Sequence, residues 1–330
     1  MKPPVSSASP DAPHDNAGER PRIVVLGSLN MDLVLRVPHA PEAGETLNGR
    51  SMATVPGGKG GNQAVSCARQ GAAVSLLGRV GADDYGRALR NALTQDGIDH
   101  TGVQTDAQEP TGVALVMVDD AAQNRIVFIA GANAGVEVDA CNPDLAQRLR
   151  GAAFLVAQFE TPLAQVVAAA VLAHRVGCKV LLNPSPAQAL PAALWPLLDT
   201  LVVNEIEARL LSGLAADTPT QAAAAARALR ERGVARVVVT LGADGAVAAD
   251  ALGCCHHPAL AVKAVDTTAA GDTFLGALAV TLANGQGFDA AVRHGIRAAA
   301  LCVTKVGAQP SIPDRSAVLQ SALPPDWISL

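Results

Sequence analysis

The sequence is poor in the features that mark several large protein classes. Only 2% of its 330 residues are aromatic, and the formal net charge is −5. With no basic stripe, the sequence argues against a nucleic-acid surface. No apolar run is long enough to cross a bilayer, so no membrane partner is expected. Thirty glycines beside so few aromatic residues indicate tight turns and close packing.

The cysteines and the first residues bear on the compartment of the protein. Six cysteines are scattered without the spacing of a disulfide framework, at positions 67, 141, 178, 254, 255 and 302. Residues 1–20 are rich in Pro, Ser, Asp and Ala, which predicts a disordered tail rather than a secretion signal. Together these features predict a reducing compartment, and therefore a cytoplasmic location.

One short segment, Cys254–His257, contains two cysteines followed by two histidines. Such residues can ligate a metal, but adjacent ligands rarely converge on one ion. No second pair of ligands follows at the spacing of a zinc finger. A strand edge or a turn is therefore the favoured interpretation.

Strand and helix patterns alternate regularly from residue 143 onward. Short apolar runs typical of buried strands are separated by stretches with helical spacing. The predicted strands are 22–27, 74–78, 154–157, 179–182, 200–203 and 236–240. The predicted helices are 62–70, 84–96, 143–150, 162–176, a segment from 205, 219–232 and 274–282. This order predicts an α/β fold with a mainly parallel central sheet and helices on both faces.

Two early β-rich stretches do not fit this alternation. Residues 33–56 read as short strands interrupted by proline and glycine, and 112–130 read as a hairpin around Asp119 and Asp120. They predict a small separate sheet, such as a lid. We therefore expect residues 21–330 to form one α/β domain, with a β lid formed by about 33–56 and 112–130.

The segment Asp266–Thr273, with the sequence D-T-T-A-A-G-D-T, is the most informative part of the chain. Its small residues stand where the predicted helix begins, and a helix start presents unpaired backbone N–H groups. Such a turn attracts phosphate. Asp272 beside it could accept a proton from a hydroxyl that attacks the phosphate. Each of its two acids could instead be a helix cap.

Other polar residues follow successive predicted strands, where ligands gather in open parallel sheets. These residues are Asn30, Asp32, Glu160, Asn204, Glu207 and the turn 240–245. An amide and a carboxylate two residues apart, as at 30 and 32, suit vicinal hydroxyls. The glycine loop 57–61 lets backbone approach a ligand. It lacks the spacing of a P-loop, and no dinucleotide fingerprint follows the first strand.

Taken together, these segments resemble the ribokinase family of the PfkB carbohydrate kinases. Six motifs occur in the family's order: G-S-L-N-M-D, G-G-K-G-G-N-Q-A, N-E-I-E, T-L-G-A-D-G, D-T-T-A-A-G-D-T-F and K-V-G-A-Q-P-S. The resemblance covers residues 22–315, and the fifth motif is highly specific for the superfamily. It implies ATP-dependent phosphorylation of D-ribose at its 5-hydroxyl.

The resemblance also implies a role for each site residue. Asp272 would be the catalytic base, with the backbone of Ala269, Ala270 and Gly271 as an anion hole. The sugar would be bound by Asn30, Asp32, Gly58, Lys59, Asn62, Glu160 and Asp272. The nucleotide site would comprise Asn204, Thr240, Leu241, Gly242, Ala243, Asp244, Gly245 and Gly271.

Two metal ions and a partner subunit follow from the same resemblance. Glu207 would help to place Mg²⁺ through water. An activating K⁺ would lie at Asp266, Thr268, Cys302, Lys305, Gly307 and Ser311, largely through carbonyl oxygens. The lid would pair two subunits as a homodimer.

Two alternative functions remain at this point. One is a kinase of another small sugar or of a nucleoside, for example deoxyribose or fructose. A deoxyribose enzyme has less to bind near C2 than the pair Asn30 and Asp32 offers, and a nucleoside enzyme needs room for a base. The other is a non-catalytic sugar sensor, against which the intact Asp272, Glu207 and Gly271 argue.

Overall fold

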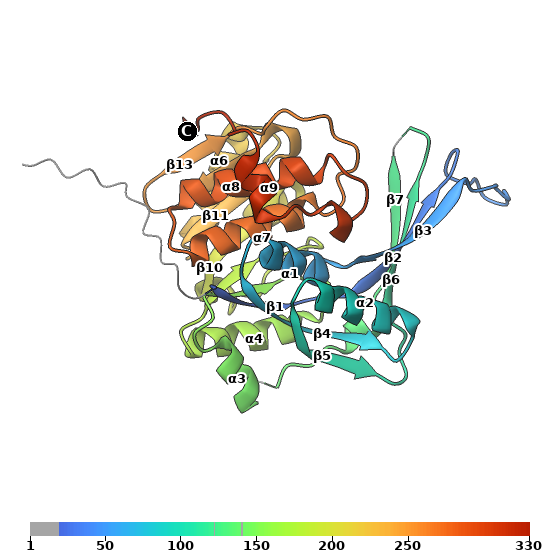
Figure 1. Ribbon diagram of the computed structural model, residues 1–330. Coiled ribbons are helices and arrows are strands. Elements are labelled where there is room, and N and C mark those ends of the chain that lie inside the picture. Colours follow the sequence, from blue (N-terminus) through green and yellow to red (C-terminus); the bar gives the residue numbers. More distant parts are fainter. Residues whose placement is uncertain (1–19, 122, 140) are drawn as a thin grey trace, which may run out of the picture.

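The computed structural model describes residues 20–121, 123–139 and 141–330 (Figure 1). In these ranges a ten-stranded sheet has the order β14-β13-β12-β11-β10-β9-β8-β1-β4-β5. Its strands are β1 (Arg22–Leu26), β4 (Ala73–Gly81), β5 (Asp99–Asp106), β8 (Phe154–Ala157), β9 (Lys179–Leu182), β10 (Leu198–Asn204), β11 (Arg236–Thr240), β12 (Ala246–Ala249), β13 (Cys254–His257) and β14 (Ile328–Ser329). Every pairing from β11 to β5 is parallel, and the pairings of β12, β13 and β14 are antiparallel. The predicted fold class is confirmed.

Helices cover both faces of this sheet. The described helices are α1 (Lys59–Arg69), α2 (Asp84–Gln95), α3 (Pro143–Leu149), α4 (Leu163–Arg175), α5 (Glu205–Ser212), α6 (Pro219–Glu231), α7 (Ala270–Ala283), α8 (Phe288–Cys302) and α9 (Arg315–Gln320). Alternate residues of β1 enter different cores. Val24 and Leu26 join the core under α3 to α6, whereas Ile23 and Val25 join the core under α1, α2, α7 and α8.

The second sheet is the small one expected from the two early β-rich stretches. It has the order β3-β2-β6-β7, with β2 (Asn30–Arg36), β3 (Ser51–Gly57), β6 (Gly112–Val118) and β7 (Asn124–Ile129). It projects away from the helices and the large sheet (Figure 1). The central strand β2 pairs in parallel with β6, and β6 forms the expected hairpin with β7.

Some boundaries differ from the sequence expectation. Helix α1 begins at Lys59, so part of the predicted glycine loop 57–61 is the first turn of a helix. Helix α8 and strand β5 have no counterpart among the predicted elements. The sequence of β5 is polar and only Val103 and Asp106 are buried, because β5 lies at the edge of the sheet. The segment Cys254–His257 forms the strand β13, as favoured.

Glycines, which have no side chain, let α1 approach its neighbours closely. A Cβ atom on Gly60 would lie 2.5–2.6 Å from backbone atoms of Gly27, at the end of β1. A Cβ atom on Gly276 of α7 would overlap the side chain of Ser66 in α1, whose hydroxyl donates to the Thr273 carbonyl at 2.9 Å. These contacts bring α1 against both the first strand and α7.

The predicted tail, 1–20, lies outside the described residues except for Arg20, whose guanidinium donates to the carbonyls of Gly71 and Ala72. Among the helices in the described ranges, none combines the length and apolar character that a bilayer span requires.

Candidate active site

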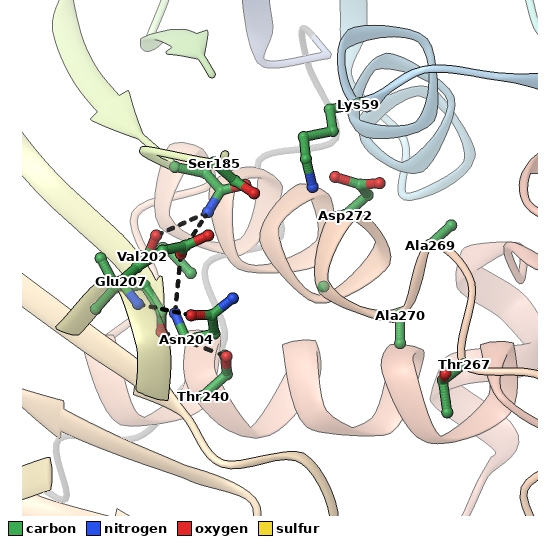
Figure 2. Close-up of a pocket in the computed structure, with 13 residues that line it drawn as sticks. Lys59, Ser185, Val202, Asn204, Glu207, Thr240, Thr267, Ala269, Ala270 and Asp272 are labelled. Atoms are coloured by element: carbon green, nitrogen blue, oxygen red, sulfur yellow. Dashed lines mark hydrogen bonds between the residues drawn. The ribbon is translucent and has the colours of Figure 1, made fainter. Parts of the chain in front are cut away.

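A cavity of about 220 Å³ opens at the carboxyl ends of β9, β10 and β11 (Figure 2). This is where ligands bind in open parallel sheets. Its lining residues come from the start of α1, from these strand ends, and from the start of α7: Lys59, Asn183, Ser185, Val202, Val203, Asn204, Glu207, Thr240, Thr267, Ala269, Ala270, Gly271 and Asp272. Of the polar residues predicted at strand ends, Asn204, Glu207 and Thr240 line this cavity, whereas Asn30, Asp32 and Glu160 are not among its lining residues.

Asp272 lies in the first turn of α7 and is only 7% exposed. Its carboxylate accepts two amide hydrogen bonds from α1, from Asn62 Nδ2 at 3.0 Å and Gln63 Nε2 at 2.9 Å. The ammonium of Lys59 points toward the same carboxylate (Figure 2). Burial raises the pKa of Asp272, while Lys59 and the two amides act in the opposite direction. The result is a sequestered acid that faces the cavity.

The backbone before Asp272 has an unusual conformation. Ala269 has φ of 61°, in the left-handed region that non-glycine residues rarely adopt. The N–H of Ala270 donates to the Thr267 carbonyl at 3.2 Å, so one of the three expected anion-hole donors is already engaged. A Cβ atom on Gly271 would meet no described atom within 4 Å. The space beside Gly271 is therefore open on the side where a side chain would stand.

The residues predicted to bind sugar meet beside the start of α1. Glu160 Oε2 accepts from Ser28 Oγ at 2.6 Å, from Asn30 Nδ2 at 3.4 Å and from the Lys59 N–H at 3.3 Å. Asn133 donates from Nδ2 to Asn30 Oδ1 at 2.8 Å and so fixes the direction of that amide. The sequence analysis missed Ser28 and Asn133; Ser28 stands inside the first motif, but no signal marks Asn133.

Tight backbone turns set the position of this group. Gly58 has φ of 83°, and a Cβ atom there would lie 2.7 Å from the Asn30 nitrogen. A Cβ atom on Gly57 would overlap the carboxylate of Asp32. Asn62 Oδ1 is buried and has no hydrogen-bond partner among the described residues. An unpaired buried acceptor of this kind suits a hydroxyl donor from a ligand.

Five ionisable groups of this region influence one another. Burial, together with the nearby carboxylates of Glu160 and Asp272, raises the pKa of Asp32 to about 7. Burial opposes the charge of Lys59, but Asp272, Glu160 and Glu207 outweigh it and raise the pKa of the ammonium. Lys59 therefore stays protonated and partly compensates a cluster of acids.

At the opposite wall, Asn204 and Glu207 form a reciprocal cap at the start of α5. Asn204 Oδ1 accepts from the Glu207 N–H at 2.8 Å, and Glu207 Oε2 accepts from the Asn204 N–H at 3.0 Å. Glu207 is also 3.4 Å from Asn183 Nδ2, a further residue that the sequence analysis missed. Burial raises the pKa of Glu207, against the effect of the Asn204 N–H.

The turn 240–245 contributes unevenly to the cavity. Thr240 lines it, whereas the side chain of Leu241 packs in the core. Gly242, Ala243 and Asp244 form a short 3₁₀ turn after β11. Gly245 has φ of 91° and leaves no room for a Cβ atom against the backbone of 257–259.

The segment predicted to bind K⁺ is also assembled. Asp266 accepts from the Thr268 N–H and Oγ1 at 2.9 and 2.7 Å and from the Gly307 N–H at 2.9 Å. Cys302 Sγ lies 3.0 Å from Ser311 Oγ and donates to the Thr268 carbonyl at 3.6 Å. The Lys305 N–H donates to the Cys302 carbonyl, which connects Lys305 to the same group of residues.

Residues 20–315 match the model of the pfkB family carbohydrate kinases. The chain belongs to the pfkB family. A ribokinase of Haemophilus influenzae is 41% identical over 91% of this chain and 98% of its own length. A ribokinase of Schizosaccharomyces pombe is 40% identical over 88% and 94%.

A solved structure gives the same result for the fold of this pfkB member. The structure of Arabidopsis thaliana ribokinase complexed with ribose and ATP is similar with a TM-score of 0.85 and 33% identity. The match covers 91% of this chain and 98% of that one. The resemblance inferred from the six motifs is confirmed at the level of the family and fold.

The raised pKa of Asp32 leads to a prediction about stability. Between pH 3.8 and about 7, Asp32 binds more protons in the folded state than in the unfolded chain, so its contribution to the free energy of unfolding falls as pH rises through this window. We expect Asp32→Asn to remove this fall and to raise the free energy of unfolding at pH 8 by roughly 1–4 kcal/mol. Denaturant titration of the ligand-free protein at pH 5 and pH 8 measures the effect.

An exposed aspartate supplies the control for this experiment. Asp314 lies at the surface before α9. In Asp314→Asn, the difference between the free energies of unfolding at pH 5 and pH 8 should be the same as in the wild type. Equal free energies of unfolding at pH 8 for the wild type and Asp32→Asn would show that the carboxylate carries no burial cost.

Proposed function

We propose that the protein phosphorylates D-ribose at O5 with ATP to give D-ribose 5-phosphate. The family is that of carbohydrate kinases, and relatives about 40% identical over nearly their full length are named ribokinases. The observation that carries the proposal is the position of Asp272. Its carboxylate lines the cavity at the start of α7 and accepts a hydrogen bond from Asn62, one of the residues predicted to bind the sugar.

In the proposed reaction Asp272 accepts the proton of the ribose 5-hydroxyl while the hydroxyl oxygen attacks the γ-phosphorus of ATP. The bond from this phosphorus to the β,γ-bridging oxygen breaks, and ADP leaves. Phosphoryl transfer depends on positioning and on charge stabilisation more than on a strong base, so a carboxylate suffices. The backbone N–H groups of Ala269, Ala270 and Gly271 receive the transferring phosphoryl group. For Ala270 this requires its weak bond to Thr267 to open.

We assign the sugar to the group beside α1. Asn30, Asp32, Gly58, Asn62 and Glu160 bind its hydroxyls there, supported by the unpaired buried acceptor of Asn62. We also assign Lys59 to the sugar site. Lys59 lines the same cavity as Asn204 and Thr240. We therefore also assign to Lys59 the stabilisation of negative charge on the phosphoryl group.

We assign the nucleotide to the opposite wall. Asn204, Thr240 and Gly271 line the cavity. The turn of Leu241, Gly242, Ala243, Asp244 and Gly245, which continues from Thr240, would hold the nucleotide beside the cavity through its backbone. Glu207 fits a magnesium ion because it is a buried carboxylate on the wall of this cavity and Mg²⁺ prefers oxygen ligands and retained water. When bound with ATP, Mg²⁺ supplies neutralisation of phosphate charge.

We also propose K⁺ as an activator at the Asp266 segment. The hydrogen bonds from Gly307 and Thr268 outweigh burial and hold the pKa of Asp266 below its ordinary value, so it remains charged. The other oxygen ligands of the ion would be carbonyl oxygens near Thr268, Cys302 and Lys305, together with Gly307 and Ser311. The segment precedes α7 directly, so its order determines the position of the anion hole.

Asp272→Asn tests the proposed base. The variant should fold and bind ribose, but its turnover should fall about 10²–10⁴-fold, the usual contribution of a general base. ADP release coupled to a set of pentoses measures turnover, and calorimetry measures ribose binding. Near-normal turnover would remove Asp272 from the mechanism, and absence of ADP formation with every sugar in the wild type would remove the kinase assignment.

Potassium gives an independent prediction. Activity should be higher in potassium than in sodium buffer of the same ionic strength, because the ion orders the 266–271 turn. Steady-state rates in the two buffers measure this, with choline chloride as the control for ionic strength. Identical rates in all three would contradict the cation site.

The small sheet supports a proposal about assembly. We propose that residues 21–330 form one domain and that the protein resides in the cytoplasm. We also propose that it dimerises through the lid of β2, β3, β6 and β7. Apolar side chains are exposed on this sheet: Met52, Ile126, Val127, Phe128 and Ile129. Unpaired edges with apolar side chains favour association with a second copy.

Sedimentation velocity tests the dimer. The wild type should sediment as a dimer, and Ile129→Glu should shift it toward the monomer because a charge would be buried in the interface. Leu252→Glu is the control, since Leu252 is 95% exposed outside the lid. A monomeric wild type at micromolar concentration would exclude the lid interface.

A further inference from the structure

The carboxylate of Asp272 is held by a residue that sugar binding does not explain. Gln63 stands next to Asn62 in α1, and its Nε2 donates to Asp272 Oδ1 at 2.9 Å. Its exposed fraction is 0%. It is not among the residues that line the cavity in the described structure. Gln63 therefore touches the proposed base from behind rather than from the substrate side.

A second buried glutamine fixes the direction of the Gln63 amide. Gln158 follows β8 and is also 0% exposed. Its Nε2 donates to Gln63 Oε1 at 2.5 Å. If the Gln63 amide were reversed, its oxygen would face the carboxylate of Asp272 and its NH₂ group would face another NH₂ group. The arrangement with the donor toward Asp272 is therefore the one that satisfies both neighbours.

Gln63 has a second acceptor within reach. Asn183 Oδ1 lies 3.4 Å from Gln63 Nε2, and Asn183 belongs to the nucleotide wall through its contacts with Val202 and Glu207. The NH₂ group carries two hydrogens, so it can donate to Asp272 and to Asn183 together. The bond from Gln158 to Gln63 Oε1 keeps this end of the amide toward both acceptors.

The position of Gln158 comes at a structural cost. Its Oε1 is buried and has no partner among the described residues. A buried acceptor without a hydrogen-bond partner destabilises the fold. A Cβ atom on Gly27 would overlap the same oxygen, so the glycine that ends the first strand makes room for this amide. An apolar side chain would fill the core without this cost, which points to a role in the site.

We propose that Gln63 is a positioning residue for Asp272 and that Gln158 holds the Gln63 amide in its working direction. The proposal rests on the proposed function, in which Asp272 is the base. With Asn62 on Oδ2 and Gln63 on Oδ1, each carboxylate oxygen already accepts one amide bond. The lone pairs that remain face the cavity, and the proton of the sugar hydroxyl is received there.

Gln63→Met is the main test, because it keeps the length of the side chain and removes its polar atoms. We expect kcat for ribose phosphorylation to fall about 10–100-fold, as for a misplaced catalytic group. KM for ribose should stay close to that of the wild type. The acidic limb of the kcat–pH profile should move up by about one pH unit, because the carboxylate loses a donor. Gln158→Met should produce the same changes to a smaller extent.

Gln63→Glu adds a readout that does not depend on the folding of the methionine variant. A protonated glutamic acid can still donate to Asp272 and accept from Gln158, whereas an ionised one repels the base. Activity of this variant should therefore fall as pH rises over a range in which the wild type is active. This inversion is not expected from a merely structural glutamine.

Gln70→Met is the matched control. Gln70 directly follows α1, is 1% exposed, and donates to the Pro313 carbonyl at 2.9 Å, away from Asp272. The Gln70→Met variant should be less stable than the wild type but should keep its kcat–pH profile. The positioning role is overturned if Gln63→Met and Gln63→Glu both keep the wild-type kcat–pH profile while Asp272→Asn is inactive. An active Asp272→Asn variant would instead overturn the proposed function.

Discussion

The site depends on an acid that is buried at the start of a helix. Removing an ionised carboxylate from water costs several kcal/mol unless charges and donors replace the water. Around Asp272 these are the amides of Asn62 and Gln63 and the ammonium of Lys59, all from the first two turns of α1. Asp272 itself stands on α7. The acid can therefore exist only where these two helices meet, and the fold has to bring them together.

Glycines make this meeting close enough for side chains to reach. Gly276 lets α7 lie against Ser66 of α1, and Gly60 lets the start of α1 lie on Gly27 at the end of β1. The first contact sets the distance between Asp272 and its amide donors. The second sets the first turn of α1 beside Glu160, which accepts the Lys59 N–H. Two small-residue contacts thus determine the geometry of a polar site.

Local signals in the sequence predicted the start of α7 and the polar strand ends, because helix starts and strand ends have short-range signatures. The order of the parallel strands then brings Asn204 and Thr240 side by side in register. Partners such as Gln63 and Asp272, 209 residues apart, have no such signature. Gln63 stands in a motif, yet its role depends on Gln158 and on the direction of an amide. Such contacts arise only from tertiary packing.

The charges of the site separate the two proposed substrates. Asp32 and Glu160 lie on the side assigned to the sugar, and burial with mutual repulsion raises the pKa of Asp32 to about 7. A neutral polyol can enter this acidic environment and supply hydroxyl donors, whereas a phosphate would be repelled. The helix start and the ammonium of Lys59 offer the opposite environment in the cavity that Asp272 also lines. Under the proposed function, the acid cluster that raises the pKa of Asp32 would therefore favour the sugar on its own side and leave the phosphates of the nucleotide to that cavity.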